Sequence, residues 1–378
     1  MKTELTINER QLILHRYPIR SNERLQAWSA GDEYLIQHIE AMALAPQSNL
    51  LILNDHFGAL SCWFAQNHHV SMMSDSYLAH QATSDNLKQN QAPEITLLTS
   101  LDPIPKTVDL VLIQLPRQNN YLKWQLHQLH TALPDNTPLI AVSKAQQIHT
   151  STLALFEEYF GDTQTSLAWK KHRLILSQLD ANKSTPDVKP CTRWVLEDSQ
   201  KIIANLPNVY SGENLDLGAR FLLSQLTHQP QIKHIIDLGC GNGVLALHAA
   251  LLNPQARITC VDESFMAIAS AKINLTHYLP NEQQVDYVAN NCLTGFEAKS
   301  ADLILCNPPF HQQQAITDHI AYQMFKDAHR TLSSHGQLLV VGNRHLRYDL
   351  KLARLFGHSQ VKLLATNPKF VILQATKP

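Results

Sequence analysis

The feature that most constrains the fold is a repeated order of strand-like and helix-like segments. In the second half of the chain, apolar strand-like runs at 234–239, 257–264, 285–290 and 301–307 alternate with stretches of helical spacing. Strands that alternate with helices of about 10–15 residues are typical of a doubly wound, mainly parallel sheet. The first half carries similar segments in the same order, so the sequence predicts two tandem copies of one α/β fold.

The two halves align segment by segment, with small differences in loop length. A polar stretch at 181–208, which contains Pro186 and Pro190, interrupts the pattern. Proline and polar residues between periodic segments indicate a connection, so domains are expected at 1–180 and 209–378. The aligned pairs are 50–65 with 235–250, 73–79 with 261–267, Asn86 with Asn274, 108–117 with 301–310, 138–144 with 337–343, and 173–178 with 370–375.

Glycine is concentrated at one predicted strand-to-helix turn. The chain has only 12 glycines, yet Gly239, Gly241 and Gly243 lie together in Asp-Leu-Gly-Cys-Gly-Asn-Gly. Glycine permits positive φ and lets backbone N–H groups approach a ligand closely. A dinucleotide-binding loop has its third glycine one residue later. Asp237 before the loop disfavours a pyrophosphate and suits a ligand with a cationic amine; the alternative is a tight turn without a ligand.

Two further polar residues follow the next predicted strands. Asp262 ends the strand after the glycine turn, where a carboxylate can accept hydrogen bonds from ribose hydroxyls. Asn291 follows the third strand and has an amide that could meet an adenine ring. These positions predict a nucleoside-containing cofactor at the carboxyl edge of the sheet.

The fourth predicted strand ends in Asn307-Pro308-Pro309-Phe310. Two prolines hold the backbone extended and remove two N–H donors. The Asn307 side chain and the Pro308 carbonyl can then accept hydrogen bonds from one amino group, and Phe310 can stack on a flat substrate. Oriented acceptors promote attack by a weakly nucleophilic amine. The alternative is a strand terminator with a core phenylalanine.

The glycine motif with its acidic following strand end resembles that of class I S-adenosylmethionine-dependent methyltransferases. This resemblance implies that Gly239, Gly241 and Gly243 wrap the methionine part of the cofactor and that Asp262 holds the ribose, with S-adenosylhomocysteine as the product. The segment 210–218 corresponds to a lead-in that often contacts the cofactor in that family; it also reads as a helix start with Asp216 near the cap.

The tetrapeptide is similar to the motif of methyltransferases that act on planar-bound nitrogen. The tandem architecture resembles the bacterial ribosomal RNA guanine-N2 methyltransferases, and the longer first half resembles the large-subunit (23S) enzymes more closely. The resemblance implies methyl transfer to a guanine 2-amino group in ribosomal RNA. The alternatives are a 16S guanine-N2, an adenine-N6 or a protein glutamine methyltransferase, and an inactive ribosome-assembly factor that binds RNA.

The first copy keeps Gly58 at the position of Gly243 but lacks two of the three loop glycines and both catalytic anchors. Asn54, Asp55 and His56 align with Gly239, Cys240 and Gly241, and Gln114-Leu-Pro-Arg117 aligns with the Asn-Pro-Pro-Phe segment. The N-terminal domain is therefore expected to be a degenerate copy that binds no cofactor and serves RNA recognition or structure.

Charge and composition narrow the partners. The formal net charge is −1, which excludes binding by bulk positive charge alone. Four basic residues are candidates for contact with RNA phosphates if 346–356 is a helix, and a solvated helix face is the alternative. They are Arg344, Arg347, Lys351 and Arg354. No Cys-x-x-Cys pair, apolar run of about 20 residues or signal-peptide core occurs, so we expect no metal, no membrane contact and a cytoplasmic location.

Overall fold

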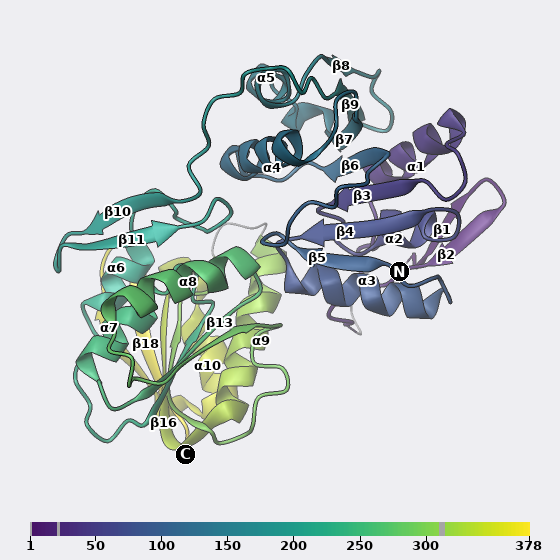
Figure 1. The fold of residues 1–378 in the computed structure, drawn as a ribbon. Helices are drawn as coiled ribbons and strands as arrows, with labels where there is room; N and C mark the ends of the chain where they lie inside the picture. Colours follow the sequence, from purple (N-terminus) through teal and green to yellow (C-terminus); the bar gives the residue numbers. More distant parts are fainter. Residues whose placement is uncertain (1, 21–22, 310–313) are drawn as a thin grey trace. The chain divides into compact units, whose positions relative to one another are not determined.

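The computed structural model describes residues 2–20, 23–309 and 314–378. The chain divides into two compact units, Met1–Pro190 and Cys191–Pro378, here called the first and second unit. Figure 1 shows that each unit holds a central sheet with helices on both of its faces.

The second unit is built on a seven-stranded sheet in the order β14-β13-β12-β15-β16-β18-β17. The first five of these strands are parallel, and β18 pairs antiparallel with both of its neighbours. The strands are β12 (His234–Leu238), β13 (Arg257–Asp262), β14 (Val285–Ala289), β15 (Ala301–Cys306), β16 (Leu332–Asn343), β17 (Val361–Thr366) and β18 (Phe370–Thr376). The helices are α6 (Leu217–Leu223), α7 (Val244–Leu252), α8 (Phe265–Tyr278), α9 (Gln314–Thr331) and α10 (Tyr348–Phe356).

The first unit repeats this arrangement, with the strand order β5-β4-β3-β6-β7-β9-β8. The predicted tandem α/β fold with mainly parallel sheets is therefore confirmed. The strands are β3 (Asn49–Leu53), β4 (His69–Ser74), β5 (Thr96–Thr99), β6 (Leu110–Gln114), β7 (Pro138–Lys144), β8 (Thr163–Thr165) and β9 (His172–Gln178). The helices are α1 (Ala30–Met42), α2 (Ala59–Phe64), α3 (Tyr77–Gln89), α4 (Asn119–Ala132) and α5 (Thr150–Tyr159).

The segment expected to connect the domains at 181–208 is not all linker. Residues 192–205 form an antiparallel hairpin of β10 (Thr192–Leu196) and β11 (Lys201–Asn205), which belongs to the second unit. The first unit begins with a similar hairpin of β1 (Glu4–Ile7) and β2 (Arg10–Ile13). The repeat thus includes an N-terminal hairpin in each copy, and the second unit begins 18 residues before the expected position 209.

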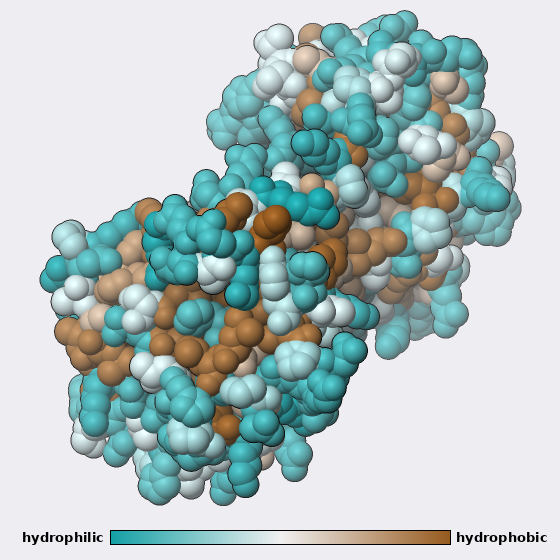
Figure 2. Space-filling model, turned by 60° about the vertical axis from the view of Figure 1, so that its left-hand side comes forward, coloured by the Kyte–Doolittle hydropathy of each residue, from teal (hydrophilic) through white to brown (hydrophobic). Residues whose placement is uncertain are grey.

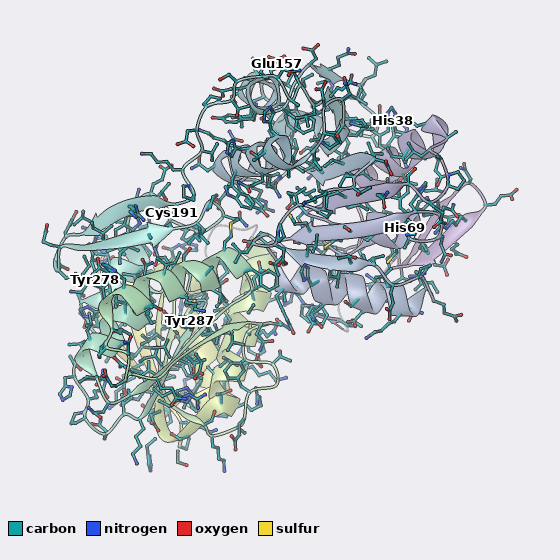
Figure 3. The ribbon with its side chains drawn as sticks, in the orientation of Figure 1. His38, His69, Glu157, Cys191, Tyr278 and Tyr287 are labelled. Carbon is teal, nitrogen blue, oxygen red and sulfur yellow. The ribbon has the colours of Figure 1, made fainter. Side chains whose placement is uncertain are left out.

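In each unit, an asparagine at the aligned position binds the hairpin or the residues that follow it. Asn86 on α3 accepts a hydrogen bond from His15 N at 2.9 Å, and Asn274 on α8 accepts one from Ala204 N at 2.8 Å. The amide groups of both asparagines donate back, to His15 O and Ala204 O, at 2.9 Å in each case. Tyr278, labelled in Figure 3, adds hydrogen bonds between its hydroxyl and the Ile202 backbone.

Both sheets are packed between apolar helix faces. In the second unit, one cluster centred on Ile235, Ile258 and Ala246 covers one face of the sheet. A second cluster that includes Ile236, Ile304 and Phe325 covers the other. Figure 2 shows hydrophobic residues scattered among hydrophilic ones on the visible surface, and exposed examples include Leu363 and Leu364 of β17.

Candidate functional site

The candidate site lies where the sheet of the second unit changes direction. From β12 the chain continues to β13 on one side, whereas β15 pairs with β12 on the other. The carboxyl ends of these parallel strands share one edge, and α/β folds bind ligands at such a switch point. Asp237 lies at the end of β12, and Asn307 directly follows β15.

The glycine turn has the backbone that its sequence predicts. Gly239, Gly241 and Gly243 have φ of 77°, 53° and 78°. A Cβ on Gly243 would lie 2.8 Å from Ala271 Cβ, so this glycine lets α7 pack against α8. A Cβ on Gly241 would meet nothing within 4 Å. Gly241 therefore faces open space, which fits a loop that surrounds a ligand.

Asp237 is a buried carboxylate with one oxygen free of donors. Its Oδ2 accepts a hydrogen bond from Ala246 N at 2.9 Å in the first turn of α7. Its Oδ1 has no partner among the residues that the structure describes. Burial, reinforced by the negative charge of Asp262, raises the pKa of Asp237 to about 7. A cationic amine beside this carboxylate would satisfy the free oxygen and stabilise the ionised form.

Asp262 ties the glycine turn to the next strand. Its Oδ2 accepts a hydrogen bond from Gly241 N at 2.9 Å, and its Oδ1 accepts one from Ser264 N at 3.0 Å. The side chain is half-buried at the end of β13. It lies at the predicted strand end and fixes the loop, while its contact with a ribose stays a prediction.

Asn291 follows β14 at the same edge of the sheet. The side chain is buried, and its Oδ1 accepts a hydrogen bond from Gln323 Nε2 on α9 at 3.0 Å. The strand register therefore places Asn291, Asp262, Asp237 and Asn307 in order along one edge, after four neighbouring strands.

Asn307 is oriented by an acidic residue from the lead-in segment. Its Nδ2 donates to Asp216 Oδ2 at 3.0 Å, and the same oxygen accepts from Ala219 N at 2.8 Å, so Asp216 also caps α6. Asn307 Oδ1 is buried and has no donor in the described part of the chain. Pro308 is buried and Pro309 is exposed, whereas Phe310 lies outside the described residues.

Asp216 is the site residue whose role the sequence did not reveal. The sequence marked it only as a helix cap, and the structure confirms that cap. Its contact with Asn307 joins residues 91 positions apart, and no local pattern signals such a pairing.

The four basic residues do not share one helix face, which corrects that expectation. Helix α10 begins at Tyr348, so Arg344 and Arg347 precede it. Arg347 has φ 48° and pairs with Asp349 at 3.1 Å, which raises the pKa of Arg347 and lowers that of Asp349. Asn343 and Arg344 end the preceding strand and begin a single 3₁₀ turn, so the chain changes direction before the helix.

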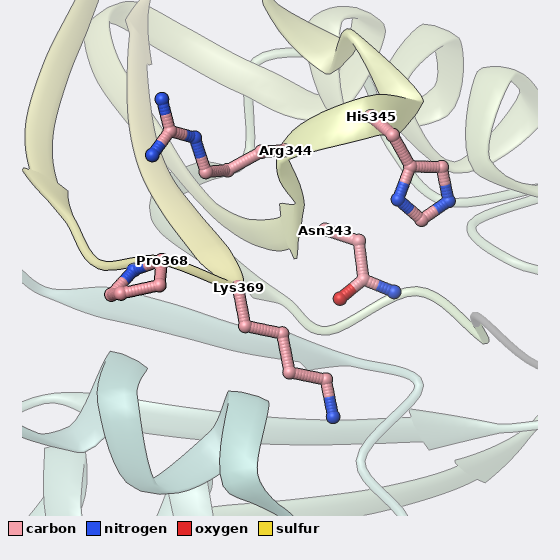
Figure 4. Close-up of a pocket in the computed structure, with 5 residues that line it drawn as sticks. All are labelled: Asn343, Arg344, His345, Pro368 and Lys369. Atoms are coloured by element: carbon pink, nitrogen blue, oxygen red, sulfur yellow. The ribbon is translucent and has the colours of Figure 1, made fainter.

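The remaining basic side chains differ in their surroundings. Lys351 donates to Leu346 O at 3.1 Å and lies over the Tyr348 ring. Arg354 is exposed on α10. Arg344 borders a depression of about 500 Å³ together with Asn343, His345, Pro368 and Lys369 (Figure 4). Within the described ranges, neither Arg344 nor Arg354 forms an ion pair.

The equivalent edge of the first unit is crossed by hydrogen bonds between side chains. Asn54 Nδ2 donates to Gln114 O at 3.0 Å and exchanges hydrogen bonds with the Gln125 amide at 3.0 and 3.1 Å. Gln114 Nε2 donates to Asp32, and His56 N donates to Gln114 Oε1 at 3.4 Å. The polar groups at this switch point therefore satisfy one another.

The described residues contain no helix long and apolar enough to cross a membrane. They also contain no group of three or more His, Cys, Asp or Glu side chains that could hold a metal ion.

Comparison with known proteins extends across both units. The family model for the RLMG N-terminal domain matches residues 2–181, and the model for the methyltransferase small domain matches residues 200–374. The chain is 60% identical over 377 residues to the ribosomal RNA large subunit methyltransferase G of Vibrio vulnificus (strain YJ016), with 100% of both chains covered. The protein of the same name from Vibrio cholerae serotype O1 (strain ATCC 39315 / El Tor Inaba N16961) is also 60% identical over 377 residues, with 100% of both chains covered.

A solved structure supports the fold of the whole chain. The 16S rRNA N2 G1207 methyltransferase of T. thermophilus, in complex with AdoMet and guanosine, superposes with a TM-score of 0.79 and 20% sequence identity. The match covers 100% of this chain and 98% of that chain. Both tandem domains thus share the fold of a two-domain enzyme.

Proposed function

Because the chain belongs to the ribosomal RNA large subunit methyltransferase G family, we propose that it methylates the exocyclic 2-amino group of a guanine in 23S ribosomal RNA. The methyl donor is S-adenosylmethionine. Relatives of 60% identity over the full length carry the name of a large-subunit enzyme, which favours 23S over 16S RNA.

The residues of the second unit fit this cofactor. S-adenosylmethionine supplies an electrophilic methyl group when it is bound, and S-adenosylhomocysteine is then the product. Asp237 Oδ1, which is buried without a donor among the described residues, would accept from the cationic amine. The loop at 239–243 would surround the methionine part, Asp262 would hold the ribose hydroxyls, and Asn291 would meet the adenine ring.

Asn307 and the Pro308 carbonyl would orient the substrate amine. Asp216 binds the Asn307 amide group, which leaves Oδ1 as the group available to accept a hydrogen bond from an amine. An exocyclic amine becomes acidic only as its new bond forms, so two neutral acceptors suffice and no strong base is required. Phe310, outside the described residues, would stack on the base after it leaves the RNA helix.

The observation that carries the proposal is the pair of donor-free oxygens at the switch point. Asp237 Oδ1 and Asn307 Oδ1 are both buried at the ends of the adjacent strands β12 and β15. Buried acceptors without donors are rare in native proteins. Asp237 Oδ1 suits the cationic amine of the methyl donor, and Asn307 Oδ1 suits the amine that receives the methyl group.

The test is methylation of ribosomal RNA from a strain that lacks the gene. We expect purified protein with S-adenosylmethionine to restore N2-methylguanosine at one 23S position, located by mass mapping of nucleosides. N2-methylguanosine in 16S RNA, N6-methyladenosine or a methylated glutamine would each redirect the assignment. No methylated product on free RNA or on ribosomal particles would contradict it.

We also propose that the first unit binds no cofactor and serves RNA recognition or structure. Its switch-point polar groups already pair with one another, which supports this division of labour. Calorimetric titration of the full chain should give one S-adenosylmethionine per molecule, and a stoichiometry of two would contradict the proposal. A cytoplasmic location belongs to the same proposal, and a ribosomal substrate supports it.

RNA phosphates would contact basic residues near the site. Arg344 and Arg354 are the better candidates of the original four, because Arg347 is paired with Asp349 and the Lys351 amine donates to a backbone carbonyl. Arg344 lies next to Asn343 at the carboxyl end of β16, beside the strand that leads to Asn307.

A further inference from the structure

A second depression, of about 370 Å³, lies in the second unit against Asp216, the residue that binds Asn307. Its lining includes Tyr210, Asp216, Asn343 and Lys369. Asp216 connects it to Asn307, because Asp216 Oδ2 accepts the hydrogen bond from Asn307 Nδ2. Figure 4 shows Asn343 and Lys369 extending toward the same side of the strand ends.

Asn343 has the same unusual state as Asn307. It ends β16, which pairs in parallel with β15, and its Oδ1 is buried without a donor among the described residues. Its backbone pairs with Phe370 in the sheet, and this pairing fixes the position of the Asn343 Cα atom. The terminal torsion of an asparagine is soft, so a small rotation can turn this oxygen toward a ligand in the depression.

Two acceptors at the ends of the adjacent strands β15 and β16 would match one edge of guanine and not of adenine. The Watson–Crick edge of guanine presents the N1–H and the 2-amino group side by side, and both are donors. Adenine presents N1 as an acceptor at the same edge. Enzymes that act on a flipped base read this edge through hydrogen bonds, and a lone pair placed against an acceptor leaves both unpaired.

We propose that Asn343 accepts a hydrogen bond from N1–H of the target guanine while Asn307 accepts one from its 2-amino group. Asn343 is then a specificity-determining residue, and it makes the site selective for guanine. This inference rests on the proposed function, since it assumes that the base is guanine. Asp216 fixes the orientation of Asn307 and lines the depression that Asn343 also lines.

The test compares two bases at the mapped target position of ligated 23S RNA. 2-Aminopurine keeps the 2-amino group and lacks the N1 proton, so its N1 lone pair would face Asn343. For the wild-type full-length enzyme at saturating S-adenosylmethionine, we expect kcat/KM to favour guanosine by about 100-fold. Asn343→Ala should slow the guanosine reaction about tenfold and reduce the preference to below about tenfold.

Asn343→Asp tests whether the side chain at this position must accept a hydrogen bond, without removing the side chain. An ionised carboxylate still accepts, so the preference should remain near the wild-type value at pH 8. When the introduced acid is protonated at lower pH it becomes a donor, so the preference should fall. This variant also keeps the inference testable if Asn343→Ala fails to fold, as judged by its affinity for S-adenosylmethionine.

The matched control is Asn281→Ala, an exposed asparagine in the loop before β14, which should change neither rate nor preference. A wild-type preference that survives Asn343→Ala at full rate would overturn the inference and leave the proposed function intact. If the wild-type enzyme forms no N2-methylguanosine, the proposed function fails and the inference fails with it.

Discussion

The turns after β3 and β12 both end in a glycine of positive φ and place their carboxylates differently. Gly58 and Gly243 both have φ 78° and both start a helix. A Cβ on either would lie within 3 Å of the helix packed against it. Ser61 and Ala246 occupy the same position in the first turn of their helices. The backbone N–H of each donates a hydrogen bond to a carboxylate.

The two capping carboxylates, Asp237 and Asp55, come from different positions in the turn. This difference distinguishes the turn of the second unit from that of the first. In the second unit, Asp237 caps the helix from the strand end, and its Oδ1 has no donor among the described residues. In the first unit Ile52 takes that position, and Asp55 caps the helix from within the loop. Asp55 accepts hydrogen bonds from Gly58 N at 3.1 Å and from Ser61 N and Oγ at 2.8 Å. In the first unit, the loop's own Asp55 therefore accepts the hydrogen bonds of the backbone N–H groups at the helix start.

The largest effect should come from Asn307, which follows β15, whereas its counterpart Gln114 at the end of β6 should have none. Asn307→Ala should slow methyl transfer about 10²–10³-fold, because one oriented contact to the reacting amine is lost. Single-turnover assays with 23S RNA measure this, and S-adenosylmethionine affinity should stay within about twofold. Gln114→Ala in the first unit should leave the rate per folded molecule unchanged. Equal losses in both variants would refute the division between the copies.

The acidic end of the second strand should give the next largest effect. Asp262→Ala should weaken S-adenosylmethionine binding by about 2 kcal/mol, or roughly 30-fold, because ribose hydroxyls and Gly241 N lose a charged acceptor. The aligned residue of the first unit is Ser74, and Ser74→Ala should leave the dissociation constant unchanged. Calorimetry of both variants decides the point, and an unaffected Asp262→Ala protein would show that the ribose binds elsewhere.

Titration of Asp237 should make cofactor affinity depend on pH. Its pKa is raised from 3.8 to about 7 by burial, so the folded protein holds this proton across that interval and the contribution of Asp237 to stability declines as pH rises through it. A cationic amine needs the ionised form. The affinity should therefore increase about tenfold per pH unit between pH 5.5 and 6.5 and level off above about pH 7. Asp237→Asn should remove this dependence, and a wild-type curve that is flat would contradict the assignment.

The smallest effect should come from Arg344, the basic residue after the carboxyl end of β16. Arg344→Ala should weaken 23S RNA binding about threefold and lower the slope of log affinity against log salt by about 1, because one phosphate contact is lost. Lys362→Ala, an exposed lysine near the start of β17, serves as the control with an unchanged slope. Filter binding across a salt series separates the two. Identical slopes would place the RNA away from this end of the sheet.

Local signals predicted the sheet and the backbone of the glycine turn, because strand periodicity and glycine positions are patterns of only a few residues. Hairpin β10–β11 escaped prediction because its polar residues and neighbouring Pro190 have the composition of a linker. The hairpin β1–β2 of the first unit and the matching attachments to Asn274 and Asn86 show that it is part of the repeat. The Asp216–Asn307 pair and the start of α10 at Tyr348 depend on tertiary packing and on the φ of Arg347, which sequence spacing does not report.

The position of Asp55 also bears on how the first copy could evolve. An Ile52→Asp change alone would bury a second carboxylate near Asp55, whose pKa is already raised to about 6 by burial and by Asp32. Loss of Asp55 alone would leave Gly58 N and Ser61 N without their acceptor. Each single step toward the other arrangement therefore destabilises the domain before any ligand can compensate. Neither single substitution therefore carries the loop of the first unit toward the arrangement of the second without a loss of stability.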